Sequence, residues 1–392
     1  SPADAQRIYE AALDRAQLAQ DRAALHLALA RAAVDAGDAR TAATHAEEAT
    51  ALFESLDDDV AAALATAVRA NALTALQDNA TAIDICEARL TSLEETPQTQ
   101  EALLLLSREL SAAHANRGEY NRFLRHVERW ILLAEALNDY EALAAAYLTV
   151  GMRYSAIGAP LTSAAMSDSA ARIARDHGKW NMLARSLNNL ATFAISRDLE
   201  AAIAQGEEGR EAARRSGVSI WVDYTTFNYA VALWTAGRLG ETQAVVADAA
   251  ETVIDPGIRL ANTVVQAWLA DATGGPLPDA VLTEETDSAS DLAWLANLEI
   301  LQALRRGSKS EATRLAAASI DHLLAAAGLE DDFMHLWPPM VEAAIAADDL
   351  ALAGRLLDPV TSAPAGIVSP AVHAQYRRLL GLVGAARGDD PA

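Results

Sequence analysis

Apolar side chains recur along the chain at spacings of three and four residues, which is the period of an amphipathic helix. Short polar turns, most of them built on a glycine, interrupt this pattern at Gly37, Gln77, Gly118, Gly158, Asp198, Gly237, Gly274, Gly307, Asp348 and Gly388. The nine intervals between these turns average 39 residues. Pairs of helices at a constant period predict an all-α fold, a right-handed α-solenoid of about ten helix-hairpin repeats.

Small side chains occupy a fixed place in this repeat. Eight of the ten residues that lie seven positions before the turns are small, the ten being Ala30, Ala70, Ser111, Gly151, Ala191, Ala230, Ala267, Ile300, Val341 and Gly381. A small residue at the crossing point of two antiparallel helices lets their backbones approach closely. We therefore expect tightly packed hairpins that bury their apolar faces only by stacking on their neighbours.

The regularity of the helical repeats varies along the chain, which suggests a division into segments. Residues 1–272 form the most regular array, and residues 292–392 continue it. Between them, Gly, Pro and acidic residues in 273–291 leave room for an irregular loop or a short helix, interpreted either as a hinge or as a surface loop. Three prolines interrupt the pattern at 357–370. Both ends have the pattern of half-repeats, so we expect a regulatory segment excised from a larger protein.

The residues from Ala145 to Ala171 resemble the tetratricopeptide repeat (TPR). The positions that match its aromatic, apolar, turn and small residues are Tyr147, Val150, Gly151, Tyr154, Gly158 and Ala170. The period is longer than the 34 residues of the standard unit. Degenerate, alanine-rich repeats of this length resemble the C-terminal solenoids of bacterial signal-transduction ATPases, nucleotide cyclases and MalT-type transcription activators. The resemblance implies a TPR-like interaction module with a signalling role.

The net charge and the composition of the chain disfavour several classes of binding partner. The chain of 392 residues has a formal net charge of −23, which disfavours nucleic acid and acidic membrane surfaces. No apolar stretch is long enough to span a bilayer, and the single cysteine, Cys86, lies on an apolar helical stripe and is expected in the core. These features predict a cytoplasmic protein without internal disulfides.

Motifs of catalysis are missing from the sequence. Gly178-Lys179 is followed by Trp180 and therefore does not complete a phosphate-binding loop. The eight histidines show no metal-ligand spacing, so we expect neither a metal nor another cofactor. Acidic pairs such as Asp57-Asp58 and Asp348-Asp349 precede helices, where carboxylates cap free N–H groups. The segment is therefore predicted to be no enzyme.

The candidate site is the concave groove, which first helices line in solenoids of this kind. In the middle repeats, the first helices concentrate aromatic rings and amides, which suit a peptide backbone or a small ligand. The predicted groove residues are Arg185, Asn188, Asn189, Thr192, Tyr224, Phe227, Asn228, Trp234, Trp268, Trp294 and Asn297. At each tryptophan, packing in the core is the competing interpretation.

The favoured function is a non-enzymatic regulatory module that binds a protein, a peptide or a small ligand in this groove and thereby biases an output domain. One alternative is a free-standing scaffold that joins proteins. Another is an enzyme with an unrecognised groove site, for which two close, buried carboxylates with displaced pKa values would be the sign. Formation of a homo-oligomer stays open.

Overall fold

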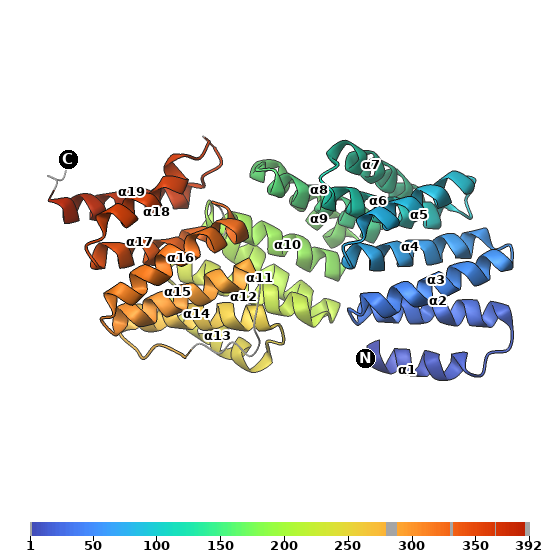
Figure 1. Ribbon diagram of the computed structural model, residues 1–392, viewed down its shortest axis with the longest axis horizontal. Coiled ribbons are helices and arrows are strands. Elements are labelled where there is room, and N and C mark those ends of the chain that lie inside the picture. Colours follow the sequence, from blue (N-terminus) through green and yellow to red (C-terminus); the bar gives the residue numbers. More distant parts are fainter. Residues whose placement is uncertain (1, 280–287, 330–331, 365, 389–392) are drawn as a thin grey trace. The chain divides into compact units, whose positions relative to one another are not determined.

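The structure is a computed structural model that describes residues 2–279, 288–329, 332–364 and 366–388. These residues form nineteen α-helices and no strand (Figure 1). The chain divides into two compact units, residues 1–153 and 154–392, with the boundary inside helix α8. Each unit is an array of antiparallel helical hairpins, so the predicted all-α hairpin fold is confirmed.

The first unit contains α1 to α7 and most of α8. Their bounds are Pro2–Leu13, Ala19–Asp35, Ala39–Ser55, Asp59–Ala75, Asn79–Ser92, Gln100–Asn116, Tyr120–Leu137 and Tyr140–Ala156. Each helix from α1 to α6 packs on the next one, and α2, α4 and α6 also contact one another in sequence, so these are the first helices of successive hairpins. The core is built largely from alanine, and buried Cys86 belongs to it, as expected.

The second unit contains the end of α8 and α9 to α19. The bounds of its helices are Pro160–Asp176, Trp180–Ile195, Leu199–Ser216, Ser219–Thr235, Leu239–Thr252, Pro256–Thr273, Ala289–Arg305, Lys309–Ala327, Phe333–Ala346, Leu350–Thr361 and Pro370–Arg387. One large apolar cluster runs through most of these helices. Because the Ala371 N–H donates to the Ser196 carbonyl at 3.3 Å, the start of α19 also meets the end of α10.

The turns between helices follow the sequence pattern closely. Nine of the ten predicted turn residues have a positive φ, including the non-glycine residues Gln77 (64°) and Asp348 (62°). An aspartate that follows the turn caps the next helix, as Asp58 does by accepting from the Ala61 N–H at 3.0 Å. Asp198 is the exception, because it is itself such a cap and accepts from the Ala201 N–H at 3.1 Å. The predicted turn is therefore displaced by one residue there.

The small residues of the repeat lie where the helices cross. Among the ten positions before the turns, all but Gly381 are buried in the structure.

The irregular segments are shorter than their sequence suggested: α14 ends at Thr273 and α15 begins at Ala289, with 280–287 outside the described residues. Pro359 lies inside α18, and Pro370 begins α19.

Candidate functional site

The first helices of the second unit meet around an aromatic cluster, here called the inner cluster: Phe227, Trp234, Trp268, Trp294 and His335. Its rings come from α12, α14, α15 and α17. The Trp268 ring lies 5.9 Å from Trp234, 5.6 Å from Trp294 and 5.3 Å from His335, measured between centroids. Phe227 meets Trp294 edge to face at 5.5 Å. Such spacings are those of packed aromatic pairs.

Polar contacts inside this cluster are made within the protein. The Trp268 Nε1–H donates to Asn297 Oδ1 at 2.9 Å, and Asn297 Nδ2 donates to the Leu336 carbonyl at 3.1 Å. His335 Nε2 and the Thr235 hydroxyl lie 3.2 Å apart, which joins α12 to α17 across 100 residues of sequence. Burial among these rings lowers the pKa of His335 to about 4, because the charged imidazolium is poorly solvated there.

Five of the eleven predicted groove residues are consequently buried, namely Phe227, Asn228, Trp268, Trp294 and Asn297. The prediction that these five side chains lie on an open surface was wrong, because other side chains cover them. First helices that are separated by several repeats, such as α12 and α17, touch one another, so their inward side chains fill the space that an open groove would leave. The other six are half-buried or exposed: Arg185, Asn188, Asn189, Thr192, Tyr224 and Trp234.

Most of the accessible residues lie on α10 and α12. Together with Trp221 of α12 they are here called the α10–α12 surface: Arg185, Asn188, Asn189, Thr192, Trp221 and Tyr224. The Arg185 guanidinium lies over the Trp221 ring at 5.3 Å, and the Trp221 ring lies 5.9 Å from that of Tyr224. Asn228 Nδ2 donates to Asn188 Oδ1 at 2.8 Å, which links the two helices below this surface. Trp221 was absent from the predicted set, although its spacing of three from Tyr224 places both on one helical face.

Carboxylates border the α10–α12 surface on one side. Burial, with the nearby charges of Asp255, Asp291 and Asp223, raises the pKa of Tyr224. Asp223 is buried and accepts from the Ile254 and Asp255 N–H groups at 3.0 and 3.1 Å. A Cβ atom at Gly257 would lie 2.9 Å from Asp291 Oδ1 and 3.3 Å from Asp255 Oδ1. Both carboxylates therefore converge beside this glycine.

The described residues offer few features of metal or membrane chemistry. No group of three or more His, Cys, Asp or Glu side chains within them could hold a metal ion. No helix in the same part of the chain has the length and apolar character needed to cross a bilayer.

A solved structure shares this architecture. A crystal structure of the apo form of RapI superposes with a TM-score of 0.62 at 11% identity, over 94% of this chain and 99% of that chain. The chain has a TPR-like α-solenoid fold. The TPR domain of P58(IPK) and yeast Tom70 also align, at 12% identity each, over 98% and 99% of this chain and 94% and 92% of theirs. Their TM-scores are 0.27 and 0.30.

Sequence comparison adds nothing to the fold. No protein-family model matches the sequence, and no curated protein matches it. An identity of 11% to RapI shows a shared TPR-like fold alone.

Proposed function

We propose that this TPR-like chain is a non-enzymatic regulatory module that binds an extended peptide segment of a protein partner on its α10–α12 surface. The observation that carries the proposal is the exposed ring of Tyr224, 36% accessible, beside the stacked Arg185 and Trp221. Aromatic rings that remain accessible on a rigid helical face are typical anchors of protein interfaces. From the resemblance to bacterial signalling solenoids, we further propose a cytoplasmic signalling role.

The charges of the surface suggest the composition of the peptide. Asp255 and Asp291 lie at its edge, and the chain as a whole carries a net charge of −23. A lysine or arginine of the partner can place its cation over the Tyr224 ring and near these carboxylates. The amides of Asn188 and Asn189 can pair with the peptide backbone. We therefore propose a peptide that carries at least one basic side chain.

Three carboxyl groups outside the α10–α12 surface have structural contacts that favour their ionised form. Hydrogen bonds and nearby cations hold the pKa values of Asp38, Glu119 and Glu241 below the ordinary value. A carboxyl group that acts as a general acid near neutral pH requires the opposite shift. These three side chains therefore serve as caps or ion-pair partners.

A peptide-binding experiment tests the proposal. The full chain is used to select ligands from a displayed library of ten-residue peptides, and affinities of the selected peptides are measured by fluorescence anisotropy. We expect enrichment of lysine or arginine, and a loss of about tenfold or more in affinity for Tyr224→Ala. Tyr140→Ala, which removes a tyrosine from the first unit, is the matched control and should bind as the wild type does. Equal affinities of the Tyr224→Ala variant and the wild type would show that peptides bind elsewhere.

A further inference from the structure

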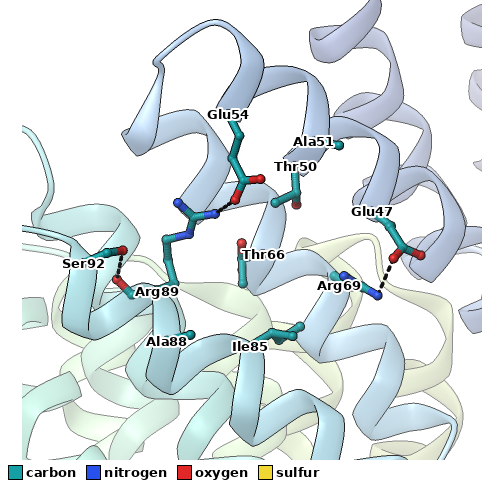
Figure 2. Close-up of a pocket in the computed structure, with 10 residues that line it drawn as sticks. All are labelled: Glu47, Thr50, Ala51, Glu54, Thr66, Arg69, Ile85, Ala88, Arg89 and Ser92. Atoms are coloured by element: carbon teal, nitrogen blue, oxygen red, sulfur yellow. Dashed lines mark hydrogen bonds and ion pairs between the residues drawn. The ribbon is translucent and has the colours of Figure 1, made fainter.

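A pocket of about 500 Å³ opens in the first unit between α3, α4 and α5 (Figure 2). The helix α3 contributes residues 47, 50, 51 and 54, and α5 contributes 85, 88, 89 and 92, so each presents one face at spacings of three and four. Thr66 and Arg69 of α4 complete the lining. The pocket lies outside the α10–α12 surface, in the other unit, and its size is that of a small-molecule site.

Two ion pairs lie on opposite sides of this pocket, with Thr50 and Thr66 between them (Figure 2). On one side, Arg89 pairs with Glu54. On the other side, Arg69 Nη2 lies 2.7 Å from Glu47 Oε1. The pocket therefore presents two cations and two anions, in two separate pairs.

The partners of each pair differ in their exposure. The side chains of Arg89 and Arg69 are only 12% and 24% exposed, whereas those of Glu54 and Glu47 are 52% and 60% exposed. The guanidinium groups are thus held in the wall, while the carboxylates can turn into solvent. Ion pairs with a solvated partner contribute little net stability. A carboxylate of a ligand can therefore take the place of one of these glutamates at little cost.

The hydroxyl groups between the pairs are oriented as acceptors. Thr50 Oγ1 and Thr66 Oγ1 each donate to a carbonyl of their own helix, those of Ala46 and Ala62, at 2.8 Å. A hydroxyl oxygen that has donated its hydrogen can still accept one. The middle of the pocket therefore favours a donor such as an ammonium group.

We propose that this pocket binds a small zwitterion that carries one ammonium and one carboxylate, a free amino acid or a dipeptide. Its carboxylate pairs with the guanidinium of Arg89, the more buried of the two arginines, in the forked geometry that arginine offers to carboxylates. Its ammonium pairs with the glutamate on the opposite side and with the two threonine hydroxyls. The walls formed by Ala51, Ala88 and Ile85 contact the apolar part of the molecule.

Electrostatics favours the zwitterion over a simple ion. A simple anion meets the field of a chain with net charge −23, and also Asp59, which lies 3.9 Å from Arg89. A simple cation meets two guanidinium groups that are fixed in the wall. A molecule without net charge avoids both penalties and satisfies both kinds of group.

Ion pairs also occur away from this pocket, and one of them supplies a control. Arg129 Nη2 lies 3.3 Å from Glu95 Oε2 in the same unit, with both side chains more exposed than Arg89. If the pairs at the pocket only tied helices together, the loss of Arg89 and the loss of Arg129 would act alike. Ligand binding should distinguish them.

The test uses the full chain and defined probes. Thermal-shift measurements with the twenty free amino acids and L-alanyl-L-alanine identify a zwitterion that raises Tm, and calorimetric titration measures its affinity. The same compound is then titrated with its amine acetylated, which leaves an anion, and with its carboxylate converted to an amide, which leaves a cation. We expect each blocked form to bind about tenfold or more weakly, because each loses a charge-assisted contact.

Variants assign the contacts. Arg89→Gln and Glu47→Gln should each weaken the zwitterion about tenfold or more, and Arg129→Gln should leave its affinity unchanged. Glu47 is largely solvated, so its variant retains the fold even if Arg89→Gln lowers stability, which circular dichroism would report. Three results would overturn the proposal: no zwitterion in the panel binds at millimolar concentration, a blocked form binds as tightly as the zwitterion, or Arg129→Gln weakens binding as much as Arg89→Gln.

Discussion

Gly206 provides a sharp test of how closely the TPR-like helices pack. It is a buried residue inside α11, where glycine costs about 1 kcal/mol relative to alanine by intrinsic helix propensity. A Cβ atom at this position would lie 3.0 Å from Tyr229 Cδ2, 3.1 Å from Tyr229 Cβ and 3.2 Å from Tyr229 Cα. The backbone of α12 therefore crosses α11 at the glycine itself.

The substitution Gly206→Ala sets these two effects against each other. Because one of the three contacts is to a backbone atom, rotation of the tyrosine ring cannot relieve the overlap, and the two helices must separate. Overpacking of this kind costs about 1–3 kcal/mol. After the gain of about 1 kcal/mol in propensity, we expect the variant to be less stable than the wild type by about 0–2 kcal/mol.

Two other glycines separate the overlap from the propensity. Gly354 in α18 and Gly381 in α19 are also helical, and a Cβ built on either meets no described atom within 4 Å beyond its own stretch of helix. Their alanine variants should gain up to about 1 kcal/mol. The difference in unfolding free energy between Gly206→Ala and these controls then isolates the overlap, and we expect about 1–3 kcal/mol.

Urea unfolding followed by circular dichroism at one temperature measures all three variants. A Gly206→Ala variant that is as stable as Gly354→Ala and Gly381→Ala would refute the reasoning. In that case α11 and α12 could move apart at no cost, and the small residues of the repeat would only be tolerated.

Further predictions concern the inner cluster. Asn297→Leu should lower the free energy of unfolding by about 2 kcal/mol or more, since the Trp268 N–H and the Leu336 carbonyl both lose their partner; an unchanged urea midpoint would contradict this. The pKa of His335, about 4 when folded, lies below the unfolded value near 6.5, so the wild type should lose up to about 3 kcal/mol as the pH falls from 6.5 to 4. Unfolding of His335→Phe, measured over the same range, should lack this part of the loss. Trp234→Ala should lower stability by about 2–4 kcal/mol because its ring packs on Trp268, which a thermal melt would detect.

The sequence was most informative where one residue decides the local backbone. Most of the short turns between two helices contain a left-handed residue, which glycine supplies without strain, and Gly118 and Gly237 have φ values of 71° and 73°. The aspartate after the turn caps the next helix, so turn and cap are encoded side by side. Asp198 was placed wrongly because an aspartate is favoured at both positions, as Asp57 and Asp58 illustrate.

The candidate site was less predictable because periodicity defines a face of a helix but not what covers that face. Asn188 and Asn228 lie on equivalent first helices and even share a hydrogen bond, yet only Asn228 is buried. Contacts between distant helices are equally hidden from the periodicity, as where α17 meets α12 at Thr235 and His335. Curvature is the sum of small rotations between repeats. These rotations depend on how the side chains of neighbouring repeats pack against one another. The sequence of one repeat alone does not specify them.

The pocket between α3, α4 and α5 follows from the same small residues. Large side chains at positions such as Thr50, Ala51 and Ala88 would fill the space between neighbouring second helices, as apolar side chains do in well-packed interiors. With small residues there, a gap remains between α3 and α5, and the long side chains of Arg69 and Arg89 line it. In the sequence, Glu47, Thr50 and Glu54 have the appearance of a solvated helical face. These α3 residues differ from an ordinary solvated face because Arg69 of α4 and Arg89 of α5 lie beside them. The arginines reach this position only when the hairpins stack. In this TPR-like array the pocket is therefore lined by residues of neighbouring repeats. It lies where the side chains between two second helices are too small to fill the space.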